Sequence, residues 1–395
     1  MAQAPARIQD RPVIIVGGGI GGMAAALALA LQGIRSLLLE QSAGIREVGA
    51  GIQIGPNAFR RFDALGIRAA IDAIAVFPDN LIMRDALTGE EVTRVPMGER
   101  ARKHWGQPYG VIHRADLLDA LYQAAQAQPL VSIRTGARVA SHSDDGRGVT
   151  VTLEDGETID GDCIIACDGL WSAFREGIVG DGKPRVSGHI AYRAVLPAAD
   201  VPAGQYENNV VLWAGPKTHL VHYPLRRGEL YNLVAVFHSS RYEEGWNSFG
   251  DAAELDERFR NQQPQVHALL DKIDSWRMWV LCDREPVAGW TKGRVTLLGD
   301  AAHPMLQYLA QGACMAMEDA VCLAGKLAAR RDDPHAAFTA YQQERYLRTA
   351  KVQVMARVYG DFYHATGPVR ELRNALLGGR TADQAYAGND WLYGG

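Results

Sequence analysis

The sequence lacks an excess of basic residues, because 41 Lys and Arg stand against 45 Asp and Glu in 395 residues, for a formal net charge of −4. Binding of nucleic acid or of an anionic membrane requires a basic surface, so this balance argues against both partners. Cysteine is also scarce, with five residues at spacings that form no disulfide pattern. We therefore expect reduced thiols and a cytoplasmic location.

Long apolar runs are few, and the one from Val13 to Leu31 contains five glycines within residues 17–22. Glycines weaken a membrane-spanning helix but suit a tight turn that binds phosphate, so we expect no transmembrane segment. The sequence is 47% hydrophobic and 22% charged, which is enough apolar residue content for a large core. The length predicts two domains, or one domain with a large insertion.

The N-terminal region has the pattern of a strand, a glycine turn, a helix and a second strand. Residues 12–16 are mostly β-branched, residues 22–32 are rich in Ala and Leu, and residues 36–40 repeat the pattern of a buried strand. This order predicts one βαβ unit with a right-handed connection.

Gly17, Gly19 and Gly22 fit the dinucleotide fingerprint G-x-G-x-x-G at the turn of this unit. Such glycines permit the tight turn, the approach of a pyrophosphate to the backbone and the packing of helix on strand. Glu40 ends the second strand, where it can accept a hydrogen bond from a ribose hydroxyl. A purely structural glycine turn is the alternative interpretation.

Two later segments carry polar residues directly after buried strands. Asp168 begins the pattern D-G-x-x-S-x-x-R, and Asp300 belongs to a Gly-Asp pair after the strand at residues 294–298. Taken alone, Asp168 would be a turn residue and Asp300 could cap a following helix. Together with the glycine fingerprint, the three segments resemble the single-component flavoprotein aromatic hydroxylases, in which they occur in this order around one FAD.

The resemblance covers nearly the whole chain and implies the fold class: a Rossmann-like α/β FAD-binding domain with an inserted antiparallel β-sheet substrate domain and C-terminal helices. The strand and helix patterns place the FAD-binding domain at residues 1–76, 108–184 and 285–330, the substrate domain at 77–107 and 185–284, and the helical region at 331–395. No second glycine fingerprint is visible, so the resemblance implies tightly bound FAD and NADH that binds only transiently.

The resemblance also assigns residues to the FAD. It implies that Asp300 contacts the ribityl or ribose part, that Asp168 helps to bind FAD and NADH, and that Arg114 lies along the cofactor. An ordinary surface arginine is the alternative for Arg114. A helix is expected from Gln307 to Ala320, and the amides of Gly312 and Ala313 at its beginning would face the flavin ring.

Within the family, residues 305–313, 218–226, 110–114 and 390–394 are most similar to the 3-hydroxybenzoate 6-hydroxylases. This likeness implies that His219 and Gln307 face the substrate ring. Residues 306–308 read Leu-Gln-Tyr, where many salicylate hydroxylases have Pro-His-x-Gly-x-Gly, and this difference counts against salicylate. Residues 309–316 resemble 6-hydroxynicotinate 3-hydroxylases, so that substrate stays open.

Strand geometry makes an independent prediction about His219. Side chains alternate along a strand, so His219 and Tyr223 share one face and His222 points to the other. A metal pair of His219 and His222 is therefore excluded, and we expect no metal site. A His219 that faces a cavity would act as base and Tyr223 would orient the substrate, whereas a hydrogen-bonded core histidine is the alternative.

The predicted activity is the hydroxylation of a phenolic aromatic acid with NADH and dioxygen, and 3-hydroxybenzoate to gentisate is the favoured reaction. Salicylate and 6-hydroxynicotinate are alternative substrates, and a non-catalytic binding protein on the same fold is an alternative from another class. A plain NAD-dependent dehydrogenase would explain Gly17 to Glu40 but not Asp168 or Asp300. The apolar C-terminal helices are compatible with a homodimer.

Overall fold

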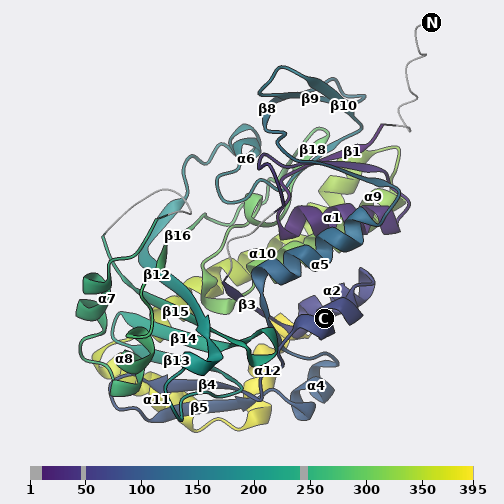
Figure 1. Cartoon of the computed structure of the whole chain (residues 1–395). Coiled ribbons are helices and arrows are strands. Elements are labelled where there is room, and N and C mark those ends of the chain that lie inside the picture. Colours follow the sequence, from purple (N-terminus) through teal and green to yellow (C-terminus); the bar gives the residue numbers. More distant parts are fainter. Residues whose placement is uncertain (1–10, 46–49, 241–247, 395) are drawn as a thin grey trace, which may run out of the picture.

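Two large β-sheets organise the computed structural model, which describes residues 11–45, 50–240 and 248–394 (Figure 1). The first sheet has the order β17-β18-β11-β1-β2-β7, and its strands pair in parallel except for β17. Its strands are β1 (Val13–Val16), β2 (Ser36–Leu39), β7 (Val131–Arg134), β11 (Ile164–Ala166), β17 (Thr291–Lys292) and β18 (Val295–Leu297). The parallel pairing of β1 with β2 across one helix confirms the predicted βαβ unit.

Three helices pack together beside the first sheet. The helix α1 (Ile20–Leu31) contacts both α5 (Arg114–Gln126) and α9 (Gly312–Ala329). Ten of the twelve residues of α1 are buried, and every residue of this helix is apolar or glycine. A helix that is apolar on every side requires partners on every side, and the sheet and two helices supply them.

The second sheet is mainly antiparallel and has the order β16-β12-β15-β14-β13-β4-β5, with β4 and β13 as its parallel pair. Its strands are β4 (Asn80–Asp85), β5 (Glu91–Pro96), β12 (Arg185–Pro197), β13 (Asn209–Gly215), β14 (Thr218–Leu225), β15 (Leu230–His238) and β16 (Arg277–Asp283). The two sheets thus draw on separate stretches of the chain, and we propose on this basis that the boundaries expected above separate two domains.

Two consecutive strands near residue 160 belong to different sheets. β10 (Thr158–Gly161) ends just before Asp162, and β11 begins at Ile164. β10 forms a three-stranded sheet with β9 (Val149–Leu153) and β8 (Val139–Asp144), whereas β11 joins the first large sheet. The residues of β11 are all apolar because this strand is buried on both faces.

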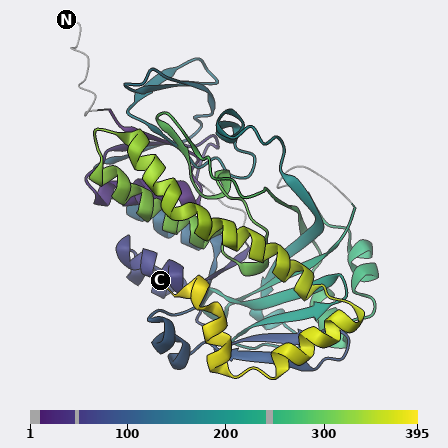
Figure 2. The same cartoon turned by 180° about the vertical axis from the view of Figure 1, so that it is seen from behind.

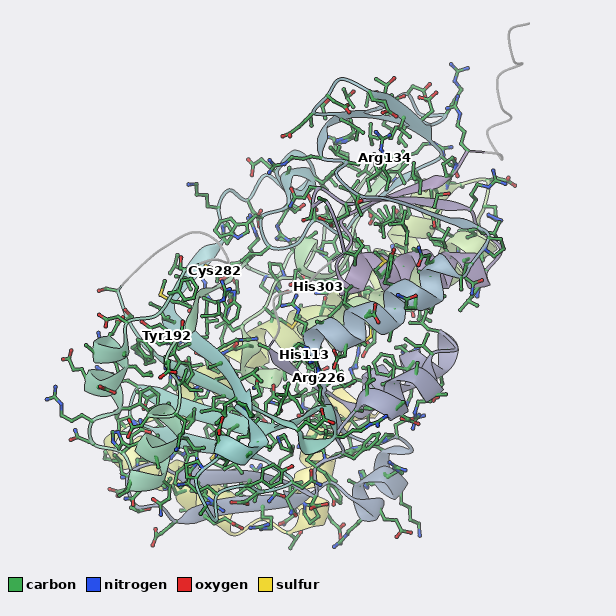
Figure 3. All side chains as sticks on the ribbon, in the orientation of Figure 1. His113, Arg134, Tyr192, Arg226, Cys282 and His303 are labelled. Carbon is green, nitrogen blue, oxygen red and sulfur yellow. The ribbon has the colours of Figure 1, made fainter. Side chains whose placement is uncertain are left out.

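Smaller elements complete the chain. The strands β3 (Gly51–Ile54) and β6 (Gly110–His113) form a two-stranded sheet. The shorter helices are α2 (Pro56–Ala64), α3 (Arg68–Ile74), α4 (Glu99–Trp105), α6 (Ala173–Ile178), α7 (Ala252–Phe259) and α8 (Pro264–Leu270). Arg226 pairs with Asp116 of α5 at 2.7 Å, and Figure 3 shows Arg226 beside His113 where the two regions meet.

The C-terminal helices are α10 (Pro334–Tyr363), α11 (Gly367–Gly378) and α12 (Ala382–Tyr393). Seen from behind, α10 runs across both regions, and α11 and α12 lie along the second sheet (Figure 2). The buried carboxylate of Asp85 at the end of β4 accepts hydrogen bonds from Arg370 and Asn374 and so holds α11 on the sheet. None of the five cysteines forms a disulfide bond. Within the described ranges, no helix has the length and apolar character needed to cross a membrane.

Candidate active site

A cavity of ≈ 680 Å³ lies between the two sheets and the C-terminal helices. Eight of the residues singled out from the sequence line it: Gly19, Arg114, His219, Tyr223, Asp300, Gln307, Gly312 and Ala313. Four others do not line it: Gly17, Gly22, Glu40 and Asp168. These four residues belong to the glycine turn or lie next to it and to the end of β11. They support one wall of the cavity and do not face its interior.

The glycine turn leaves an open space beside Gly19. A Cβ on Gly17, whose φ is +107°, would lie 2.4 Å from the carbonyl oxygen of Cys167, and a Cβ on Gly22 would lie 1.9 Å from the carbonyl oxygen of Gly17. These two glycines are therefore required by packing. Gly19, by contrast, is exposed to the cavity and has no neighbour within 4 Å of a Cβ position. A pyrophosphate can reach the backbone at this point.

Glu40 holds the glycine turn in place. Its Oε2 accepts a hydrogen bond from the backbone N–H of Gly18 at 2.7 Å, and its Oε1 accepts one from Ser42 at 2.8 Å. The carboxylate thereby connects the end of β2 to the beginning of α1. A ribose contact by Glu40 stays a prediction.

Asp168 has a structural role for one oxygen and no partner for the other. Oδ2 accepts a hydrogen bond from the backbone N–H of Ala173 at 2.9 Å and so supports the first turn of α6, which agrees with the alternative of a turn residue. Oδ1 is buried and has no hydrogen-bond partner among the described residues. Burial raises the pKa of this carboxyl. Its neighbours in sequence, Cys167 and Gly169, line the cavity, so Asp168 lies beside the cavity wall.

Asp300 opens onto the cavity. It lies in a 3₁₀ turn at Gly299–Ala301, and desolvation by the surrounding protein raises the pKa of its carboxyl. The alternative that Asp300 caps the next helix is wrong, because α9 begins only at Gly312 and its N-cap residue is Gln311. Arg114 lines the same cavity and its positive charge acts on this carboxyl in the opposite direction.

The helix expected from Gln307 to Ala320 is also shorter than predicted. Gln307 begins a 3₁₀ turn that ends at Leu309, and Ala310 has a φ of +52°, a left-handed conformation that L-residues rarely adopt. This turn interrupts the helix before Gly312. The interruption directs Gln307 into the cavity, and it leaves the first amides of α9 at Gly312 and Ala313 free to face a ligand.

Two polar side chains of β14 lie at the other end of the cavity. His219 and Tyr223 of β14 line it, as their shared strand face predicts, and burial lowers the pKa of His219 to about 3. Burial also raises the pKa of Tyr223 well above its usual value. His222 lies on the opposite face, where it accepts a hydrogen bond from Trp213 at 3.1 Å and contacts Tyr231 at 2.9 Å. The predicted alternation is confirmed.

Arg193, which was not predicted from the sequence, lies in β12 and lines the cavity. Its Nη2 donates a hydrogen bond to Oε1 of Gln307, and its guanidinium lies over the ring of Trp279 at 5.0 Å. Its Nε is buried without a hydrogen-bond partner among the described residues. Burial lowers the pKa of Arg193 to about 10, so the side chain stays cationic at neutral pH. A charged residue within an apolar strand was the signal that could have revealed it.

The chemistry of this cavity fits FAD. The open turn at Gly19 and the amides at the beginning of α9 suit a pyrophosphate and an electron-rich ring, and Asp300 offers an acceptor to sugar hydroxyls. The cavity continues past these groups to His219 and Arg193, which leaves a place for a small molecule beside the ring.

Comparison with known proteins agrees with this assignment. The family model described as "FAD binding domain" matches residues 10–356. The chain is 48% identical to a 3-hydroxybenzoate 6-hydroxylase of Klebsiella oxytoca, over 96% of each chain, and 46% identical to one of Polaromonas naphthalenivorans, over 98% of this chain and 96% of that one. The crystal structure of Klebsiella pneumoniae HpxO complexed with FAD and uric acid superimposes with a TM-score of 0.86 at 26% identity, over 98% of each chain. The chain therefore belongs to the FAD-dependent aromatic monooxygenases, and FAD is its cofactor.

Proposed function

We propose that this chain hydroxylates 3-hydroxybenzoate at the ring carbon para to its hydroxyl group and releases gentisate. The balanced reaction consumes 3-hydroxybenzoate, NADH, dioxygen and one proton, and gives gentisate, NAD⁺ and water. The single observation that carries the proposal is the meeting of a cation, an amide and a histidine at one end of the cavity: Arg193, Gln307 and His219. The similarity to two 3-hydroxybenzoate 6-hydroxylases supports the same substrate.

Arg193 suits the carboxylate of the substrate. It is a cation that lines the cavity, and its Nε lacks a hydrogen-bond partner in the described part of the chain. Its Nη2 donates a hydrogen bond to the neutral amide of Gln307. A buried guanidinium is stabilised by an anion that can accept two of its N–H groups. An aromatic carboxylate would supply that anion, and a neutral aromatic ring would not.

His219 suits the phenol of the same ring. Its Nδ1 lies 2.7 Å from Nε2 of His364, which leaves its own Nε2 to accept the phenolic proton. The imidazole is neutral near pH 7, because burial lowers its pKa to about 3. Withdrawal of the proton makes the ring carbon para to oxygen more nucleophilic, and such base catalysis contributes about 10²–10⁴-fold. Gln307 would fix the orientation of the substrate ring through a hydrogen bond.

The remaining site residues would hold FAD. Gly19, Arg114, Asp300, Gly312 and Ala313 all line the cavity where it would bind. When bound, FAD supplies the redox chemistry by which NADH and dioxygen deliver one oxygen atom to the ring. The protein's part is to place the ring against the flavin and to exclude water from the cavity.

The test is a substrate screen on the FAD-loaded enzyme. We expect 3-hydroxybenzoate to stimulate NADH oxidation with formation of a product that co-elutes with gentisate and has its mass. Salicylate, 6-hydroxynicotinate and benzoate, which lacks the phenol, are the comparisons, and NADPH is tested as the alternative donor. Product from salicylate or 6-hydroxynicotinate but not from 3-hydroxybenzoate would contradict the substrate assignment.

A matched variant separates carboxylate binding from hydroxylation. Arg193→Met removes the cation and keeps most of the side-chain volume, so we expect KM for 3-hydroxybenzoate to rise by at least about tenfold, which corresponds to about 1.4 kcal/mol. Arg227→Met is the control, because Arg227 is exposed and does not line the cavity. Equal KM values for the two variants would remove Arg193 from the substrate site.

We also propose that the chain forms a homodimer through its C-terminal helices. Leu347 of α10 is 73% exposed, and Val369, Leu372 and Leu376 of α11 are each more than 60% exposed. Val369, Leu372 and Leu376 are spaced three and four residues apart and so share one face of α11, and such an exposed apolar patch marks an interaction surface. Sedimentation velocity of the wild type and of Leu372→Asp tests this, and a monomeric wild type would contradict it.

A further inference from the structure

Three histidines form a hydrogen-bonded chain that leads away from the cavity. Nδ1 of His219 lies 2.7 Å from Nε2 of His364, and Nδ1 of His364 lies 3.0 Å from Nε2 of His238. They come from three separate elements: β14, the residue after α10 and the end of β15. His364 thus uses both of its ring nitrogens to connect His219 to His238.

The three imidazole rings become less buried from His219 to His238. His219 is 3% exposed and lines the cavity, His364 is 4% exposed, and His238 is half-buried and does not line the cavity. The chain therefore begins at the substrate end of the cavity and ends at a ring that solvent can reach.

We propose that His364 and His238 carry the phenolic proton from His219 to solvent, as positioning and relay residues for the hydroxylation. The inference rests on the proposed function, in which His219 accepts that proton.

The transfer conserves every proton. The phenol gives its proton to Nε2 of His219, Nδ1 of His219 gives its own to Nε2 of His364, Nδ1 of His364 gives its own to Nε2 of His238, and His238 releases one to water. In this sequence each ring gains one proton and loses another, so no ring has to remain cationic. The reverse transfer restores the original tautomers.

The relay explains how a weak base can serve here. A histidine whose pKa is lowered to about 3 retains a proton poorly, so a proton that stayed on His219 would return to the substrate. Onward transfer to a half-exposed ring removes it. Burial lowers the pKa of His238 as well, and this ring is the one that water can reach.

The surroundings of the chain contain few fixed charges. The titratable and charged groups that face it are His189, Tyr308, Tyr363, Lys217, Arg258 and Asp361. His189 contacts the hydroxyl of Tyr308 at 2.5 Å, and its ring is tilted against that of His238 with the ring centroids 4.2 Å apart. Lys217 and Arg258 disfavour a cationic His238, and Asp361 favours one.

A metal site is the competing use of these rings, since His189, His238 and His364 each place a nitrogen within 4.8 Å of the others. One feature favours the relay: Nδ1 of His364 and Nε2 of His238 are at hydrogen-bond distance, 3.0 Å. In a hydrogen bond between two imidazoles the lone pair of one nitrogen points at the proton on the other, so these two nitrogens do not both direct a lone pair toward one ion.

The experiment measures proton release. FAD-loaded enzyme is mixed with 3-hydroxybenzoate without NADH in weak buffer that contains a pH-indicator dye, and the rate of proton release is followed by stopped flow. We expect His364→Phe to slow proton release at least about tenfold, within the range of base catalysis, with unchanged affinity for FAD. His238→Ala should slow it less, and millimolar imidazole should restore the rate because that position is open to solvent.

Several controls separate the outcomes. His267→Asn alters a histidine of α8 outside the chain and should release protons at the wild-type rate. Wild-type rates in both His364→Phe and His238→Ala, in an enzyme that forms gentisate, would overturn the relay alone. Loss of wild-type activity on treatment with EDTA would overturn it in favour of a metal. A wild type that hydroxylates none of the three acids would contradict the proposed function, and the relay with it.

Discussion

Oδ2 of Asp319 lies 2.5 Å from Nε2 of His303, and neither side chain is more than 1% exposed. Oδ2 also accepts a hydrogen bond from the backbone N–H of Gly299 at 3.2 Å, and Oδ1 accepts one from Arg345 at 2.6 Å. One carboxylate in α9 thereby holds the loop that presents Asp300 to the cavity. His303 helps to shape this loop through its buried contact with Asp319.

Asp319→Asn should loosen this loop and destabilise the fold. Removal of one partner from a buried ion pair costs about 3–5 kcal/mol, and we expect a loss of this size in the free energy of unfolding at pH 7. Urea unfolding of the apoprotein measures it. Asp332→Asn, at an exposed position, is the control and should unfold like the wild type.

The same pair predicts a dependence of stability on pH. Burial opposes ionisation of Asp319, but His303 and Arg345 outweigh it and lower its pKa to about 2. An unfolded aspartate has a pKa of about 3.9, so the stabilisation is fully present above that pH and is lost as the pH falls toward 2. The difference in unfolding free energy between wild type and Asp319→Asn should therefore shrink from pH 4 to pH 2. A constant difference over this range would contradict the ion pair.

Gly19 and Gly22 should respond differently to the same substitution. The Cβ of Gly19→Ala meets no protein atom within 4 Å, so we expect normal thermal unfolding but at least about tenfold weaker FAD binding, because the methyl group occupies the pyrophosphate position. The Cβ of Gly22→Ala would lie 1.9 Å from a backbone oxygen of Gly17, so we expect about 1–3 kcal/mol of destabilisation. Flavin titration and unfolding of both apoproteins measure this. Equal FAD affinities in wild type and Gly19→Ala would place the pyrophosphate elsewhere.

Local pattern predicted the parts of the site that depend on neighbours in sequence. The glycine turn depends on backbone sterics within six residues, and the opposite faces of His219 and His222 follow from strand geometry alone. The 3₁₀ turn after Pro304 was missed because Ala310 adopts a left-handed conformation that its residue type does not favour. Tertiary packing around the cavity overrides that preference.

The partners of His219 and Gln307 could not be predicted, because each comes from a distant segment. His364 lies 145 residues after His219, and Arg193 lies 114 residues before Gln307. No local pattern relates such positions in a single sequence. The same reason explains why the buried contact of Asp85 with α11 emerges only from the fold.

Asp300→Ala should yield folded protein that purifies without colour. Its carboxyl opens onto the cavity and makes no structural hydrogen bond within the described residues, so loss of the side chain should remove an FAD contact and spare the fold. The visible spectrum and the unfolding temperature of the purified variant check both statements. Asp274→Ala, at an exposed position, should purify yellow. A yellow Asp300→Ala would remove this residue from the cofactor site.

His219→Ala and His222→Ala are a matched pair on opposite faces of one strand. His219→Ala should slow hydroxylation by about 10²–10⁴-fold, because the phenol loses its proton acceptor, and it should leave the FAD dissociation constant unchanged. His222→Ala breaks the contacts with Trp213 and Tyr231 and should cost about 1–3 kcal/mol of stability, with hydroxylation per folded enzyme close to wild type. Turnover, flavin titration and urea unfolding on both variants distinguish the two roles. If His219→Ala lost FAD affinity and hydroxylation in equal measure, His219 would be a structural residue, and the case for base catalysis would fail.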